Sequence, residues 1–305
     1  MSNTEVSEKD MWEQLPHKIG EEKAELLLAL SKKIYGRGSG DEALALAESA
    51  QEIYESLGSE IYKQDIANAY TGISHSLKKL NKTEEAIKVI DKAVAILKDE
   101  NYPYIDDLYR TKAIWHSEIG EWDKTLQCHL DSVRINEIDG DDEWLARSQY
   151  NVGVAYGNLN DYPSAINQYQ IAREIFKKLK AVPEVARCDE AISAAYIELG
   201  FGEQALEYGN KALNVTRVGN WPVRLMWILA NIGQANMLLG DYEAAEVSFD
   251  EARELAISVD ETDWYFVVQI NSEIVKLMRA TNQDSEADLL EERIKTIQDI
   301  LDTQI

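Results

Sequence analysis

An internal duplication limits what this chain can fold into more than any other feature. The segment Asn151–Ala165 reads NVGVAYGNLNDYPSA, and Asn231–Ala245, eighty residues later, reads NIGQANMLLGDYEAA. The match extends into the following segment, where Ala-Arg-Glu begins at Ala172 and again at Ala252. Similarity at a fixed interval is typical of repeat arrays, in which each unit packs only on its neighbours.

The repeat is marked by a small residue near the start of every second expected helix. The series is Ala43, Ala86, Thr125, Ala165, Ala205, Ala245 and Ala287, at intervals of 43, 39, 40, 40, 40 and 42. A Gly or Asn, expected to take the positive φ of a helix C-terminus, precedes each one: Gly40, Asn81, Gly120, Asn160, Gly200, Gly240 and Asn282. Between these turns apolar residues recur at i, i+3 and i+4, which predicts amphipathic helices rather than strands.

The pattern predicts an all-α solenoid of about seven antiparallel helix pairs, because a single pair cannot bury its apolar face alone. The expected pairs are 21–57, 60–99, 102–138, 143–180, 183–219, 221–259 and 262–302. Residues 1–20 are expected to form a mobile leader, or alternatively a short docking helix that uses Trp12. Residues 21–302 form the array. Its last pair is expected to act as a solvent-facing cap, because its second helix is predominantly acidic.

The charge balance limits the classes of partner. With 55 acidic and 31 basic side chains the net charge is -24, which repels nucleic acid and anionic lipid, and no Lys/Arg run offers a basic patch. No apolar run has the length of a membrane span. Cys128 and Cys188 form no CxxC pair, which suits a reducing compartment. The sequence therefore predicts a cytoplasmic protein without nucleic-acid or membrane partners.

The two best-matched units share a series of small and aromatic residues at fixed spacing. The fourth has Val152, Gly153, Tyr156, Asn160, Tyr162, Ala165, Tyr169 and Ala172, and the sixth has Ile232, Gly233, Asn236, Gly240, Tyr242, Ala245, Phe249 and Ala252. This series resembles the tetratricopeptide repeat. The period near 40 is longer than the family's usual 34 residues, and it is similar to the arrays of kinesin light chain, cell-polarity adaptors and Rap-type peptide receptors. The resemblance implies a right-handed superhelix whose first helices line a concave groove for a peptide or a partner protein.

Two asparagines fall at the groove position of their units. Asn151 and Asn231 each lie 14 residues before the repeat Ala, where the family resemblance implies an Asn that holds a peptide backbone. An amide suits that role because it both donates and accepts hydrogen bonds. The alternative is a polar residue tolerated on a half-exposed helix face.

Arginines and aromatic residues supply further candidates for contacts in the groove of units three to six. Arg110, Arg147, Arg187 and Arg224 precede the local small residue by 15, 18, 18 and 21 positions, so they share one helical face and could bind a carboxylate-bearing segment. Alternatively, each pairs with a neighbouring carboxylate such as Glu190 or Asp107. Tyr150 and Trp227 are candidate anchors. The aromatic residues at the starts of first helices are expected to pack on the preceding helix instead: Tyr62, Tyr104, Trp144, Trp221 and Trp264.

Nothing in the sequence points to catalysis, a cofactor or a metal. His116 and His129, with Cys128 beside them, stand at packing positions, and a hydrogen-bonded histidine pair is expected there; the alternative, a zinc site, needs further ligands. No P-loop, dinucleotide-binding, nucleophile-elbow or zinc-protease motif occurs. We therefore expect a non-enzymatic peptide- or protein-binding adaptor. The alternatives are a peptide-responsive regulatory sensor of the Rap type and a self-assembling structural element, and the sequence leaves the oligomeric state open.

Overall fold

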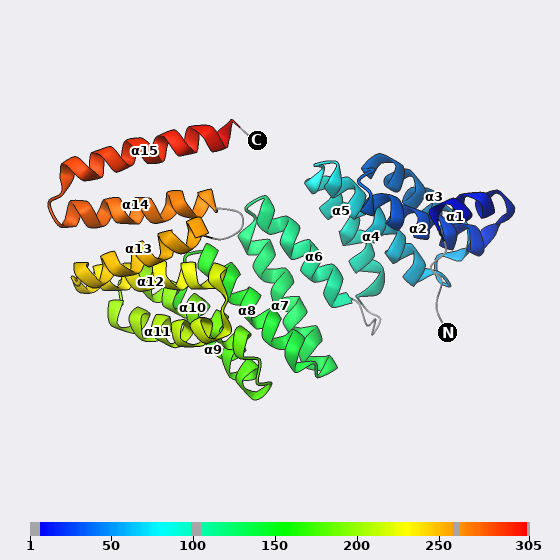
Figure 1. Ribbon diagram of the computed structural model, residues 1–305. Helices are drawn as coiled ribbons and strands as arrows, with labels where there is room; N and C mark the ends of the chain where they lie inside the picture. The colour runs from blue at the N-terminus through cyan, green and yellow to red at the C-terminus, as the bar shows by residue number, and fades with distance from the viewer. Residues whose placement is uncertain (1–6, 99–104, 259–262, 304–305) are drawn as a thin grey trace. The chain divides into compact units, whose positions relative to one another are not determined.

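The chain forms helices almost throughout. The computed structural model describes residues 7–98, 105–258 and 263–303, and within these ranges there are fifteen α-helices, one 3-10 helix and no strand (Figure 1). No helix in these ranges combines the length and the apolar character needed to span a membrane. The chain divides into two compact units, Met1–Asp139 and Gly140–Ile305.

Unit 1 begins with a short helix and continues as three helix pairs. Its elements are α1 (Glu8–Gln14), η1 (Leu15–His17), α2 (Gly20–Gly36), α3 (Gly40–Gly58), α4 (Lys63–Lys79), α5 (Thr83–Leu97), α6 (Ile105–Glu118) and α7 (Trp122–Asp139). Each helix packs on the next one in sequence from α2 to α7. Met11 and Leu15 pack against the cluster that contains Leu30 and Tyr54, so residues 8–17 are helical and contact the first pair. The predicted mobility of residues 1–20 stays a prediction.

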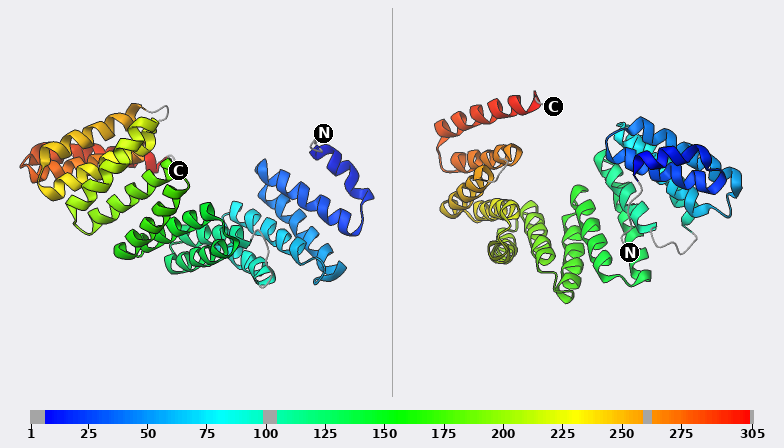
Figure 2. Two further views of the ribbon diagram at one scale, coloured as in Figure 1. Left: turned by 90° about the horizontal axis from the view of Figure 1, so that it is seen from below. Right: turned by 45° about the vertical axis from the view of Figure 1, so that its right-hand side comes forward.

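Unit 2 consists of four helix pairs. Its elements are α8 (Asp142–Asn158), α9 (Tyr162–Lys178), α10 (Val182–Glu198), α11 (Gly202–Gly219), α12 (Pro222–Leu239), α13 (Tyr242–Ser258), α14 (Trp264–Ala280) and α15 (Asp284–Asp302). Consecutive helices lie side by side, as two further views show (Figure 2). The first helices also touch one another, α10 with α12 and α12 with α14. The predicted helix pairs are confirmed; the predicted bounds at 99, 102, 259 and 262 lie outside the described residues, and the others differ by about three residues at most.

The last pair is buried on one side only. Of α15, only Ala287 and Ile294 are fully buried, and they pack with Val275 of α14. The predicted role of 262–302 as a cap is consistent with this burial and stays a prediction.

The turns inside the pairs adopt the predicted backbone in six of seven cases. Asn81, Gly120, Asn160, Gly200, Gly240 and Asn282 have φ between 60° and 76°. The prediction for Gly40 is wrong, because Gly38 (φ 110°) makes that turn and Gly40 is the first residue of α3. A Cβ on Gly40 would lie 3.0 Å from a methyl carbon of Leu80, so this glycine serves close packing instead.

In the fourth and sixth pairs a glycine lies twelve residues before the repeat Ala, where the two helices of the pair approach each other closely. A Cβ on Gly153 would lie 2.6 Å from the Tyr169 ring, and one on Gly233 would lie 2.3 Å from the Phe249 ring. In the fifth pair both positions are small, since Ser193 faces Gly209, and Ile232 of α12 lies 2.9 Å from where a Cβ on Gly209 would be. The volume shared by the two positions therefore sets how closely the helices pack.

Candidate binding pocket

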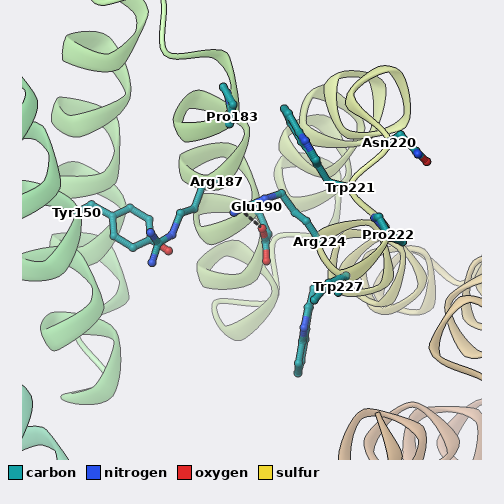
Figure 3. A pocket seen from close by; sticks show the side chains of 10 residues that line it. Tyr150, Pro183, Arg187, Glu190, Asn220, Trp221, Pro222, Arg224 and Trp227 are labelled. Carbon is teal, nitrogen blue, oxygen red and sulfur yellow. Dashed lines mark hydrogen bonds and ion pairs between the residues drawn. The ribbon is translucent and has the colours of Figure 1, made fainter. Parts of the chain in front are cut away.

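Unit 2 contains an open pocket of about 730 Å³ formed by its first helices α8, α10 and α12 (Figure 3). Its lining residues are Tyr150, Pro183, Arg187, Glu190, Asn220, Trp221, Pro222, Val223, Arg224 and Trp227. Four of them were predicted from the sequence as groove contacts: Tyr150, Arg187, Arg224 and Trp227.

One side of the pocket is a stacked arginine. Arg187 of α10 places its guanidinium carbon 4.3 Å from the centre of the Tyr150 ring on α8, within the range of a cation–π contact. Tyr150 is itself held by Tyr169, with ring centres 5.2 Å apart. Burial raises the pKa of Tyr150, so its ring stays a neutral phenol at physiological pH. In the described part of the chain no carboxylate lies within 4.0 Å of Arg187, so its guanidinium lines the pocket without an ion pair.

The opposite side holds an ion pair between two helices. Arg224 Nη1 of α12 donates to Glu190 Oε2 of α10 at 2.9 Å. Burial raises the pKa of Glu190, and the nearby guanidinium of Arg224 opposes that shift. Glu190 and Arg187 stand three residues apart on α10, so they share one face of the helix. With two cations and one anion, the pocket is locally positive in a strongly acidic protein.

Apolar side chains complete the wall. Trp227 meets the Phe266 ring edge-on, with centres 4.7 Å apart and planes at 79°, so its indole is fixed by the neighbouring pair. Pro183, Trp221 and Pro222 lie at the start of α10 and α12 and form the rim. Trp221 was predicted to pack on the preceding helix. Its ring does lie over Gly219, where a Cβ would approach it to 2.7 Å, but it also lines the pocket.

The two asparagines lie outside the pocket lining. Asn231 Nδ2 donates to the backbone oxygen of Glu190 at 3.5 Å, a long hydrogen bond between α12 and α10. Asn151 is half-buried on α8, and within the described residues its side chain makes no hydrogen bond. Their expected role in holding a peptide backbone therefore stays a prediction.

The other two arginines are engaged with carboxylates. Arg147 of α8 pairs with Glu143 at 2.8 Å and approaches Glu184 at 3.9 Å. Arg110 belongs to α6 of unit 1 and pairs with Asp106 and Asp107. The alternative interpretation of the arginine series, pairing with local carboxylates, thus describes Arg110, Arg147 and Arg224, whereas Arg187 is the exception.

The histidines of unit 1 do not form the expected pair. His116 Nδ1 lies 2.6 Å from Glu121 Oε2, because Glu121 follows in the turn after α6 and reaches back to the ring. His129 is buried with Nδ1 unpartnered, and burial lowers its pKa to about 4. The described residues contain no group of three or more His, Cys, Asp or Glu side chains placed to hold a metal ion.

Comparison with known families agrees with the repeat register. One tetratricopeptide repeat model matches residues 104–178, and a second matches residues 67–96 and 228–256. The chain contains tetratricopeptide repeats. The matched ranges fall in both units and include α8, α9 and most of α12 and α13, and of the pocket-lining residues only Tyr150 lies within them.

Similar proteins differ widely in what else they contain. The human outer dynein arm-docking complex subunit 4 is 26% identical over 241 residues, which are 71% of this chain and 34% of that protein; the chain thus spans about a third of its length. Among solved structures, a signal-transduction ATPase with a tetratricopeptide repeat sensor from Pyrococcus horikoshii matches 97% of this chain and 45% of its own, at 18% identity and a TM-score of 0.70. The apo form of RapI matches 92% of this chain and 99% of its own, at 14% identity and a TM-score of 0.65. The two solved structures are similar in fold.

Proposed function

We propose that this tetratricopeptide repeat protein is a non-enzymatic adaptor that binds a carboxylate-bearing segment of a partner protein or peptide in the pocket of unit 2. The observation that carries the proposal is Arg187. Its guanidinium is exposed, lacks a carboxylate partner in the described part of the chain and is held on the Tyr150 ring beside an apolar wall.

The chemistry of the pocket suits an acidic side chain next to an apolar one. A guanidinium presents a planar set of donors that matches a carboxylate in two parallel hydrogen bonds. The stacking on Tyr150 restricts the Arg187 side chain before the ligand arrives, which lowers the entropy lost on binding. Trp227 and Trp221 offer large rigid surfaces to the apolar neighbour.

The pocket supports binding better than catalysis. Among the described residues that line it, the only carboxylate, Glu190, is engaged by Arg224, and none is a Ser, Thr, Cys, Lys or His that could act as a nucleophile or a proton carrier. Both cysteines are buried thiols, which agrees with a cytoplasmic protein. The name of the human relative, a docking-complex subunit, also suits an adaptor. Contact is expected to extend to Asn151 and Asn231 on the same first helices.

An arrayed set of 12-residue peptides tests this proposal. Each peptide contains Phe-X-Glu at its centre and has a twin with Gln in place of Glu. Wild type should retain a subset of the Glu peptides and bind their Gln twins at least about tenfold more weakly, the effect of losing a charge-assisted pair. Arg187→Ala should lose the same peptides. Arg293→Ala, which removes an exposed arginine from α15, is the matched control and should keep them. Equal binding of Glu and Gln peptides, or binding unchanged in Arg187→Ala, would contradict the proposal.

A second candidate is a regulatory sensor. It is favoured by the ion pair between Arg224 and Glu190, which links α12 to α10 and which a ligand carboxylate can break. The solved structures that resemble this chain include a tetratricopeptide repeat sensor and RapI. Small-angle scattering with and without a retained peptide separates the two candidates. A sensor should change its radius of gyration, and an adaptor should keep the same scattering profile.

A further inference from the structure

The pocket contains a carboxylate of its own, which already pairs with one of the two arginines that line it. Figure 3 shows Arg187 turned toward Tyr150 and Glu190 paired with Arg224, with Glu190 Oε2 accepting from Arg224 at 2.9 Å. We propose that Glu190 is an internal competitor that occupies the anion position and must give up Arg224 before a partner carboxylate can bind there. This inference rests on the proposed function and adds to it how the site is regulated.

The repeat does not require an acid at this position. The residues forty positions before and after Glu190 are Tyr150 and Ala230, on the equivalent turns of α8 and α12. Equivalent packing therefore accommodates an aromatic ring or a methyl group. Arg224 is equally specific to its own helix pair, since the residue forty positions earlier is Glu184. The ion pair belongs to this pocket and is not a general feature of the helix pairs.

Occupation by Glu190 changes what the pocket can bind. With Glu190 in place, Nη1 of Arg224 is already engaged, and an incoming anion meets a like charge beside its binding position. The side chains of Glu190 and Arg224 are 22% and 29% exposed, so water and salt screen this competition only in part. Arg187 alone remains for the ligand.

The consequence is selectivity against free small anions. A simple carboxylate can contact Arg187 but cannot displace Glu190 without compensation. A partner that also places an apolar side chain on Trp227 gains the additional contact needed to compete. Glu190 thus makes the pocket respond to a carboxylate together with an apolar neighbour and not to negative charge by itself.

Titration with phenylacetate tests the competitor role without knowledge of the partner. Binding is followed through the indole N–H signals of Trp221 and Trp227 in two-dimensional NMR, assigned with Trp→Phe variants. Glu190→Gln removes the negative charge and keeps similar size, and it should bind phenylacetate at least about tenfold more tightly than wild type. Glu190→Ala should also bind more tightly, which excludes an effect specific to the amide. Glu184→Gln removes the same charge elsewhere on α10 and should match wild type, because Glu184 does not line the pocket.

The outcomes test the competitor role of Glu190 separately from the proposed function. Phenylacetate affinity that is equal or weaker in both Glu190 variants, or undetectable in all proteins, overturns the competitor role even if the peptide array succeeds. Tighter binding in Glu184→Gln as well would show a general charge effect and would also overturn it. If both Glu190 variants gain affinity while wild type shows no preference for Glu peptides, the competitor role holds and the proposed function fails. Near-native circular dichroism spectra of the variants establish that each one is folded.

Discussion

At the scale of single residues, two glycines of α8 have opposite surroundings on one helix. A Cβ on Gly153 would lie 2.6 Å from the Tyr169 ring, whereas one on Gly157 would meet only the Tyr169 hydroxyl, at 3.9 Å. We expect Gly153→Ala to lower the free energy of unfolding by about 1–3 kcal/mol, because the ring or the helix must shift. Urea denaturation measures the difference.

Gly157→Ala is the internal control for that measurement. Alanine is the better helix former by about 1 kcal/mol, and the site has room for its methyl group, so this variant should be as stable as wild type or more stable. Similar destabilisation by both substitutions would show that contact with the Tyr169 ring does not determine the effect of Gly153→Ala.

A buried imidazole makes unit 1 sensitive to acid. Burial lowers the pKa of His129 to about 4, whereas an unfolded histidine has a pKa of about 6.5. As the pH falls, the unfolded state therefore binds a proton at this residue before the folded state does. The contribution of His129 to stability is therefore complete above pH 6.5 and is lost as the pH falls toward 4. Between pH 7.5 and 4.5 wild type should lose about 2 kcal/mol more than His129→Leu. Parallel losses measured by urea denaturation at the two pH values would contradict this assignment.

At the scale of helices and turns, the sequence predicts the pairs well because the signals are local. Apolar spacing and the Gly or Asn of each turn act within a few residues, and the helix bounds follow from them. The exception lies in Gly36-Arg-Gly-Ser-Gly40, where three glycines can each end a helix, and only the contact of Gly40 with Leu80 of another pair decides which one does. That contact is not local and so leaves no local signal.

The pocket was predictable to the extent that helix register determines it. Tyr150, Arg187, Arg224 and Trp227 project from the first helices at predicted positions. Glu190 was predicted only as a partner for arginine, because sequence spacing does not show that it pairs with Arg224 of α12 in the same pocket that Arg187 lines. Packing on the preceding helix and contact with a ligand both favour an aromatic residue at the position of Trp221, so the sequence does not distinguish these two roles.

A buried ion pair joins α9 to α10 across the boundary between two helix pairs. Arg173 Nε donates to Asp189 Oδ1 at 2.6 Å, and Asp189 is only 3% exposed. Burial raises the pKa of Asp189, and Arg173 opposes that shift. Arg173→Met should destabilise the protein by about 3 kcal/mol, since it leaves a buried carboxylate without its partner.

A second substitution separates loss of the pair from loss of packing. Arg173→Met combined with Asp189→Leu should recover most of the lost stability, because two apolar side chains leave no charge to solvate. Lys211→Met, which removes the more exposed pair with Glu207 on α11, should cost less than about 1 kcal/mol. If the double variant is no more stable than Arg173→Met in urea denaturation, Asp189 has another structural role.

At the scale of the whole molecule, the net charge of -24 opposes the compact state. Many of the ion pairs join residues three or four apart on one exposed helix face, for example Lys211 with Glu207 and Lys276 with Glu273. Such pairs add little to stability. We therefore expect repulsion among the surplus carboxylates to outweigh the attraction within these exposed ion pairs. The locally positive pocket of unit 2 is an exception in this acidic protein.

This balance predicts that salt stabilises the protein. The Debye length falls from about 30 Å at 0.01 M to about 8 Å at 0.15 M, so added salt weakens repulsion between distant carboxylates more than contacts between paired groups. Tm should rise by at least about 2 °C between these two concentrations of sodium chloride, which corresponds to about 1 kcal/mol for a chain of this size. Potassium chloride should act equally, because screening depends on ionic strength and not on the monovalent cation. A Tm that falls with salt in differential scanning calorimetry would mean that the ion pairs, and not the surplus charge, dominate the electrostatic free energy of folding.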